Sequence, residues 1–297
     1  MPENEPTPAS EPKAKPARPE RKAAREKPNP LALARRIQEE NTTLVNPNGS
    51  GFWAFNGKVF APIHDYEINK KTIRMAGFSS GSSLMENVRA LLKSETFTAA
   101  EDFWDMNGAN ESFIACQNLM VNTRTFEVSE HDPKYRLRNL LPVSYDPAAT
   151  CPRFEQAMEQ WIPDDLKARF FLIEYMGYCL TTDVSQEAFL VLVGEGANGK
   201  GRFVRIIESL LGRKNVGGVA LQSLQREKSC FAAALDGKLL NLCTETEKGP
   251  FDEGFLKALI SGDTVKVEWK YGQPFDMRSI AKFIVQTNNP PHITDHS

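Results

Sequence analysis

A glycine-rich segment between a strand pattern and a helix pattern constrains this chain more than any other feature. The apolar run 188–193 leads into Gly-Glu-Gly-Ala-Asn-Gly-Lys at 194–200, and the apolar residues that follow share one helical face up to Gly212. In a strand, glycine loop and helix of this kind, backbone N–H groups converge on a phosphate at the helix N-terminus. The segment therefore predicts an α/β fold built around a phosphate-binding loop.

Two phosphate-binding patterns fit the same letters. Glycines at 194, 196 and 199 also satisfy the dinucleotide pattern G-x-G-x-x-G. However, Lys200 follows the last glycine, and no Asp or Glu stands near 216–221, where a dinucleotide site would hold a ribose hydroxyl. We therefore predict a triphosphate site, although a glycine-rich turn with a surface lysine is the plain alternative. The predicted binding residues are Gly194, Glu195, Gly196, Ala197, Asn198, Gly199, Lys200, Gly201 and Arg202.

Gly201 departs from the usual pattern of such loops. Most of them carry Ser or Thr directly after the lysine, and its hydroxyl is a ligand of Mg²⁺. With glycine at this position, water molecules and distant carboxylates would have to coordinate the metal. The departure bears on hydrolysis more than on nucleotide binding.

Two further apolar strand patterns, at 239–243 and 280–285, end in polar residues that can complete the site. An acid at the tip of a strand neighbouring the glycine loop can hold Mg²⁺ and orient the attacking water. Glu245 is the first candidate for this metal-binding and catalytic role and Glu247 the second, and a solvated pair of acids is the alternative. The amide of Asn288 could contact the γ-phosphate or that water, although asparagine before proline is also ordinary turn chemistry.

The segment 263–275 alternates apolar and charged residues and contains a glycine turn, which is typical of a β-hairpin. Lys266 and Lys270 fall on its polar face, and Tyr271 follows at the turn. These three residues could bind nucleic-acid phosphates and stack on a base. A cationic edge that merely prevents aggregation is the alternative.

The remaining organisation follows from composition. Residues 1–30 are rich in Pro, Lys, Arg, Glu and Ala without an aromatic residue, so we expect a disordered tail. Residues 31–183 are expected to form a smaller, mostly helical domain with some α+β structure. Residues 184–297 are expected to form the α/β domain with the glycine loop, and the boundary is placed at 181–187.

Helix or hairpin patterns occur at 31–40, 51–61, 81–93 and 151–180. The pair Asn56-Gly57 predicts a type I′ turn in the hairpin. The part 166–180 is apolar on most sides, which is typical of a helix buried between two layers. Short β-like pieces alternate with turn residues between 103 and 146.

Charge, cysteine spacing and hydropathy argue against a strongly basic nucleic-acid-binding protein, a Cys or His metal site and a membrane protein. A formal net charge of −2 supplies no global basic field, so any nucleic-acid contact must come from a local patch. The five cysteines and four histidines lack metal-ligand spacing, so we expect free, buried thiols. No apolar run is long enough to span a bilayer and the first residues are polar, so we expect a cytoplasmic protein without membrane contact.

These elements in this order resemble the superfamily 3 DNA helicases, the C-terminal helicase region of the phage, plasmid and poxvirus-type primase-helicase family. The resemblance runs from about residue 103 to 297. It rests on the segments 194–200, 245–247, 257–271 and 287–295, and 141–147 looks like part of the helical domain before the motor.

The resemblance implies an AAA+-like P-loop ATPase domain that assembles into a ring, usually a homo-hexamer. Such a ring hydrolyses ATP with Mg²⁺ between its subunits and draws single-stranded DNA through a central pore. The implied catalytic residues are Lys200, Glu245, Glu247 and Asn288, and Lys270 would be the lysine of the pore hairpin.

Two parts of the family pattern are missing from this sequence. An arginine pair follows the sensor segment in the family, whereas this chain stops at Ser297, so the arginine finger is absent unless Arg278 or Arg202 replaces it. The priming half is absent as well, so a separate primase would be a partner. The chain is therefore expected to be C-terminally truncated.

Two alternatives to an active motor stay open. The first is a catalytically weak nucleotide-binding ring subunit or truncated fragment, which Gly201 and the missing arginine finger both favour. The second is a small-molecule kinase, which would need a mobile, arginine-bearing lid.

Overall fold

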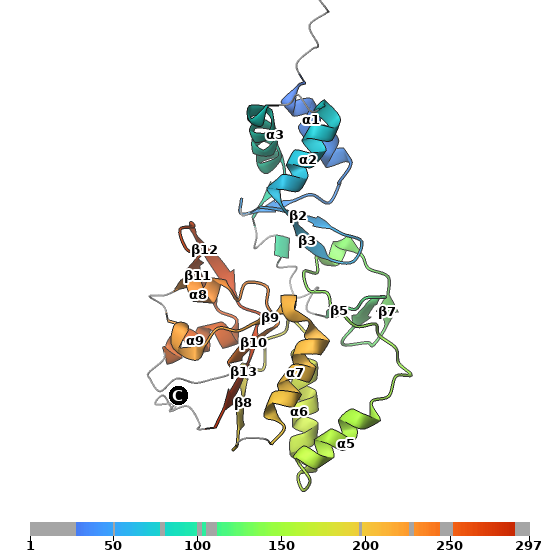
Figure 1. Ribbon diagram of the computed structural model, residues 1–297, viewed down its shortest axis with the longest axis vertical. Helices are drawn as coiled ribbons and strands as arrows, with labels where there is room; N and C mark the ends of the chain where they lie inside the picture. Colours follow the sequence, from blue (N-terminus) through green and yellow to red (C-terminus); the bar gives the residue numbers. More distant parts are fainter. Residues whose placement is uncertain are drawn as a thin grey trace, which may run out of the picture.

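The computed structural model describes residues 28–49, 51–77, 81–99, 103–104, 112–195, 198–225, 229–243 and 252–288. Figure 1 shows a helical part at the top and a larger lower part in which helices lie on both sides of a sheet. The expected tail lies outside the described residues, apart from 28–30.

The upper part is a small helical core closed by a hairpin. It contains α1 (Pro30–Glu39), β1 (Asn46–Pro47), β2 (Phe52–Phe55), β3 (Phe60–Ile63), α2 (Asp65–Ala76), α3 (Ser82–Glu95) and β4 (Phe97–Thr98). Ile37, Ile68 and Leu92, one from each helix, are buried together with apolar residues of β2. The helices predicted at 31–40 and 81–93 are confirmed, whereas α2 was not predicted.

The β2–β3 hairpin is confirmed, but its predicted type I′ turn is wrong. A type I′ turn requires a positive φ at both central residues. In the segment 56–59 only Gly57 has a positive φ, of 94°. The Asn56 carboxamide accepts hydrogen bonds from the N–H groups of Lys58 and Val59 instead, at 3.0 Å each, so a side chain organises this turn.

The middle of the chain combines short strands with helices. It contains β5 (Phe113–Ala115), β6 (Met120–Asn122) and β7 (Val128–Ser129), the 3₁₀ turn η1 (Pro133–Tyr135), α5 (Pro152–Trp161) and α6 (Leu166–Tyr178). The single helical stretch expected at 151–180 is therefore two helices. Ile162 precedes a proline and has φ −137° and ψ 76°, so the first helix ends there. Asp165 then caps the second helix by accepting from the Ala168 N–H at 2.9 Å.

The prediction that α6 is buried between two layers is wrong. Leu166, Phe170 and Phe171 are 57%, 56% and 52% exposed. Tyr175, which lies opposite Leu166 and beside Phe171 on the helix, is buried, and its hydroxyl donates to the Phe283 carbonyl at 2.8 Å. One side of α6 therefore covers the sheet, and the other side faces solvent.

The lower part is organised by a parallel sheet. Its strands are β8 (Phe189–Val193), β9 (Val216–Gly217), β10 (Leu240–Cys243) and β13 (Lys282–Thr287), in the order β8-β13-β10-β9. Helix α7 (Lys200–Leu211) follows β8, and η2 (Arg213–Asn215), η3 (Leu221–Ser223), α8 (Ser229–Ala233) and α9 (Glu253–Ser261) complete the connections. All three predicted strands are present. However, β10 does not neighbour β8 as expected, because β13 lies between them.

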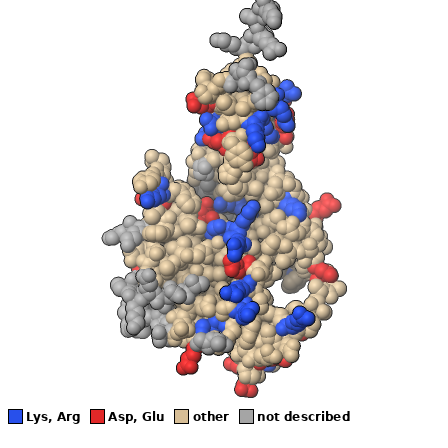
Figure 2. Space-filling model, viewed as in Figure 1, with Lys and Arg blue, Asp and Glu red and all other residues tan. Residues whose placement is uncertain are grey.

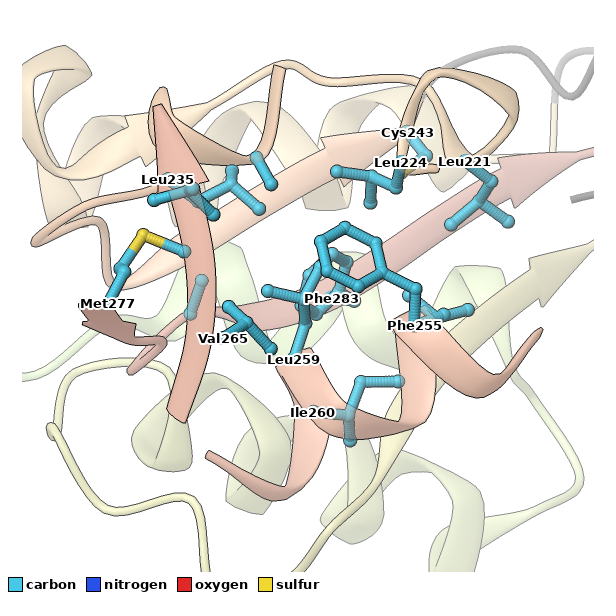
Figure 3. Packing of buried hydrophobic residues seen from close by; sticks show 14 of the residues in the cluster. Leu221, Leu224, Leu235, Cys243, Phe255, Leu259, Ile260, Val265, Met277 and Phe283 are labelled. Atoms are coloured by element: carbon cyan, nitrogen blue, oxygen red, sulfur yellow. The ribbon is translucent and has the colours of Figure 1, made fainter. Parts of the chain in front are cut away.

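Apolar residues on both faces of the sheet form two cores. Successive residues of a strand point to opposite faces, so Phe283 packs with Phe255 and Leu259 of α9 (Figure 3), whereas Ile284 packs on the side of α6 and α7. This second core also contains Met158 of α5. Since it joins residues from both sides of the expected boundary at 181–187, that boundary does not separate two cores.

The predicted hairpin at 263–275 is present as β11 (Thr264–Glu268) and β12 (Pro274–Arg278). Val265 and Val267 are buried, whereas Thr264, Lys266 and Glu268 are exposed, as the alternation predicts.

All five cysteines are free, and Cys116, Cys179 and Cys243 are buried, whereas Cys151 is exposed and Cys230 is intermediate. In the described part of the chain, His, Cys, Asp and Glu form no cluster able to hold a metal ion. None of the described helices has the length and apolar character needed to cross a membrane.

Candidate functional site

The glycine loop lies at the carboxyl end of β8, where α7 begins. Lys200, the first residue of α7, donates from Nζ to the Glu195 carbonyl at 3.1 Å, to Asn198 Oδ1 at 3.0 Å and to the Gly194 carbonyl. The lysine is therefore held across the loop, next to the N–H groups at the start of α7. Gly196 and Ala197 lie outside the described residues.

A tryptophan from a distant helix packs on this loop. Gly199 has φ 90°, and a Cβ at this position would lie 2.6 Å from Cδ1 of Trp161 in α5. Both the backbone conformation and the indole ring therefore require glycine here. Sequence reasoning missed Trp161, because nothing in the spacing of the two segments links them.

A cleft of about 490 Å³ opens beside the loop. It is lined by Asn198, Gly199, Lys200, Gly201, Arg202, Arg205, Gln286 and Asn288. Of the predicted loop residues, 198–202 meet Asn288 in this cleft, because the carboxyl ends of parallel neighbours β8 and β13 share one edge of the sheet. Arg205 and Gln286 were missed. Their spacing could have indicated them. Arg205 follows Arg202 by one helical turn and Gln286 precedes Asn288 by two residues, so each shares a face with a residue that was predicted.

The electrostatics of the cleft suit an anion. Lys200, Arg202 and Arg205 contribute three cationic groups, and no carboxylate belongs to the described lining. Both arginines are exposed. Figure 2 shows a column of Lys and Arg side chains down the middle of this face, over α7. The helix N-terminus adds its partial positive charge at the same point.

The expected metal carboxylates belong to the segment that follows β10 in the sequence. Glu245 and Glu247 lie outside the described residues, which end at Cys243 on this strand. Cys243 pairs with Val285, so β10 approaches the edge of the sheet that carries the cleft. Burial raises the pKa of the Cys243 thiol to about 12, so this thiol stays protonated at neutral pH and is a poor nucleophile.

The three candidate nucleic-acid contacts divide between two places on the β11–β12 hairpin. Tyr271 lies at the tip, 96% exposed, with φ 65°, and the Lys270 ammonium lies 5.2 Å from its ring. Trp269 is 50% exposed beside them and stacks on Phe275. Lys266 lies lower on the strand, with its ammonium 4.0 Å from the Asp276 carboxylate.

Two family models match parts of this chain. Residues 26–163 match a family described as D5 N terminal like, and residues 192–297 match a family of unknown function, DUF5906. The first match covers the upper part and the short strands through α5. The second contains the glycine loop, the cleft and the β11–β12 hairpin.

A search of curated proteins found a viral relative. The chain is 26% identical over 184 residues to the protein named "Putative helicase L207/L206" of Acanthamoeba polyphaga mimivirus. The alignment covers 60% of this chain and 17% of the relative, so the chain spans about a sixth of the relative's length.

Solved structures show the same fold. Two apo structures of the NrS-1 C-terminal region match with TM-scores of 0.52 and 0.51, both at 12% identity. The matches cover 90% of this chain and 59% and 60% of those chains. The mixed α/β arrangement around a parallel sheet is therefore shared with that region, of which this chain spans about six tenths.

Proposed function

We propose that this chain is the ATP-dependent motor part of a replication primase-helicase, of the superfamily 3 type with an AAA+-like P-loop. The cleft carries the proposal, because the glycine loop, three cationic side chains and the carboxamides of Gln286 in β13 and of Asn288 directly after it face one space. The relative named as a helicase and the D5 N terminal like match support the same assignment.

Different residues of the cleft would bind the phosphates of a nucleoside triphosphate and orient the attacking water. The N–H groups at the start of α7 and the Lys200 ammonium bind the β and γ phosphate oxygens. Arg202 and Arg205 continue the positive surface along α7. The Asn288 amide orients the water that attacks the γ-phosphate, with Glu245 as its base and Glu247 as the second candidate.

The site fits Mg²⁺ only together with the nucleotide, because its three cationic groups would repel the ion alone, whereas the phosphates would carry it in. The carboxamide oxygens of Gln286 and Asn288 would then be available as neutral ligands. Magnesium bound with the nucleotide would neutralise charge on the phosphate oxygens. Glu245 is the proposed carboxylate ligand.

The β11–β12 hairpin is the proposed contact with single-stranded DNA. Lys270 would bind a phosphate and Tyr271 would stack on a base, since both lie at an exposed tip. Lys266 would add charge along the same strand. A homo-hexameric ring with the DNA in its pore, and a primase supplied by another domain or protein, complete the proposal.

The test is ATP binding and hydrolysis by the whole chain, with and without single-stranded DNA. Lys200→Ala removes charge-assisted hydrogen bonds to the phosphates, and we expect it to weaken ATP binding about 10- to 100-fold. Lys214→Ala, at an exposed lysine beyond the far end of α7, is the matched control and should bind as the wild type does. Equal binding by wild type and Lys200→Ala would refute the proposal.

A second function has one observation in its favour. Gly201 lacks the hydroxyl that most phosphate-binding loops present to Mg²⁺, which favours a ring subunit that binds nucleotide and hydrolyses it poorly. Lys200-dependent binding without turnover, and without stimulation by DNA, would select this alternative.

A further inference from the structure

Gly201 sits at the second position of α7 with open space in front of it. A Cβ built on Gly201 would meet a single described heavy atom within 4 Å, Nε2 of Gln286 at 3.5 Å. This is an ordinary van der Waals distance, and Gly201 has no positive φ among the described residues. Backbone conformation and packing therefore both permit a side chain at this position. Most phosphate-binding loops carry a Ser or Thr hydroxyl here as a ligand of Mg²⁺, so another group must supply this ligand in a chain with glycine.

Gln286 comes to this point from the other side of the cleft. It pairs with Leu192 of β8, and its side chain lines the cleft opposite the start of α7. Its carboxamide forms no hydrogen bond with any described residue. Rotation about the last side-chain bond brings either the oxygen or the nitrogen to the same point. The oxygen can therefore face the space that a Ser or Thr hydroxyl at 201 would occupy.

The other oxygens of the cleft are less suited to this position. Asn198 Oδ1 already accepts a hydrogen bond from the Lys200 ammonium at 3.0 Å. Asn288 is exposed and follows the end of β13. The remaining side chains of the lining are cations, which repel a metal ion. Gln286 is thus the uncommitted oxygen donor that faces Gly201.

We propose that the carboxamide oxygen of Gln286 takes the place of the hydroxyl that Gly201 lacks, as a ligand of the Mg²⁺ that arrives with the nucleotide. The proposal rests on the proposed function, because it requires a nucleoside triphosphate in the cleft. It assigns Gly201 and Gln286 as a pair: the glycine leaves the space, and the glutamine supplies the oxygen. Gln286 would therefore act on the metal-dependent part of binding and not on the contact of Lys200 with phosphate.

The measurement is the affinity for ATP in Mg²⁺ and in EDTA, by isothermal titration calorimetry on the whole chain. The ratio of the two affinities is the gain due to the metal. We expect Gln286→Ala to reduce this gain about tenfold and to leave the affinity in EDTA unchanged. Gln186→Ala, at an exposed glutamine before the amino end of β8, is the matched control and should keep the full gain.

Two further variants separate a metal ligand from a phosphate contact. Gly201→Ser, added to Gln286→Ala, should restore most of the gain, because it returns a hydroxyl to the expected position. Gln286→Glu should increase the gain and weaken binding in EDTA, since a carboxylate attracts the metal and repels phosphate. A Gln286→Glu variant that binds more weakly under both conditions would overturn the assignment, because the amide N–H₂ would then be the group in use.

The failure of this proposal can be told apart from failure of the proposed function. If wild-type binding depends on Lys200 but Gln286→Ala keeps its full metal gain, Gln286 is not a ligand and the nucleotide site stands. If Lys200→Ala binds ATP as the wild type does, the nucleotide site and the Gln286 assignment are both refuted.

Discussion

Lys282 is the first residue of β13, the strand that contains Gln286 and leads to Asn288, and it is 2% exposed. Its ammonium donates to the Ile280 carbonyl at 3.1 Å and to the Thr181 carbonyl, and it lies 5.0 Å from the centre of the Tyr178 ring. Burial lowers the pKa of Lys282 from its ordinary 10.5 to about 8, against the opposing influence of Cys179 and Asp183. We predict that this lysine makes the free energy of unfolding rise with pH above about 8, and that Lys282→Met removes this rise.

The sign and size follow from the two protonation states. Below pH 8 the lysine is charged in both the folded and the unfolded chain, and the cost of its burial is fully present. Between about pH 8 and 10.5 the unfolded chain binds a proton that the folded chain has released, so the free energy of unfolding rises with pH. From pH 7.5 to 9.5 we expect roughly 2 kcal/mol, because each pH unit inside this window contributes about 1.4 kcal/mol.

The assay is urea unfolding of wild type and Lys282→Met at several pH values in this range. The thiol of Cys179 and the phenol of Tyr178, whose pKa values burial raises to about 12, lower stability at high pH, but they are present in both proteins. The difference in free energy of unfolding between the two proteins therefore isolates Lys282. The free energy of unfolding of the wild type should rise relative to that of the variant as pH increases. A difference that stays constant from pH 7.5 to 9.5 would refute the reasoning.

Three further predictions concern other parts of the molecule. Arg138 forms hydrogen bonds with both carboxylate oxygens of Asp236, and its guanidinium lies over the rings of Trp53 and Trp104. Arg138→Met should therefore lower the free energy of unfolding, measured in urea titrations, by about 2 to 3 kcal/mol. A loss below about 0.5 kcal/mol would contradict this. Tyr271→Ala should weaken binding of an oligo-dT strand by about 1 to 3 kcal/mol in fluorescence anisotropy without changing the melting temperature. Phe170→Ser on the exposed face of α6 should change stability by no more than about 0.5 kcal/mol, and a larger loss in thermal unfolding would show that this side chain is buried after all.

Much of the site could be predicted because it is local. The strand, loop and helix around Lys200 follow one another in the chain, so their apolar periods and glycines indicated the fold and the loop together. Asn288 was found for a similar reason, since it directly follows a strand. Gln286 was missed, although it precedes Asn288 by the two-residue period of a strand, because the expected strand ended at 285 whereas β13 continues to Thr287.

Other predictions failed where competing local chemistry decided the outcome. Asn56 organises its turn through its own carboxamide, so the Asn-Gly pair did not need two positive φ angles. A proline after Ile162 divided the predicted helical stretch at 151–180 into two helices. The apolar composition of α6 indicated burial on all sides, yet Phe170 faces solvent, because composition alone does not tell how many layers cover a helix.

The sequence by itself determined the strand patterns, the glycine loop, Lys200 at the start of a helix and the alternation of the β11–β12 hairpin. These features depend on backbone preference and on periods within contiguous residues. Only the tertiary structure decided that β13 lies between β8 and β10, that Trp161 packs on Gly199, and that Gln286 faces Gly201. Burial of apolar surface is non-directional, so several strand orders would bury similar areas, and the packing of the whole chain selects one of them.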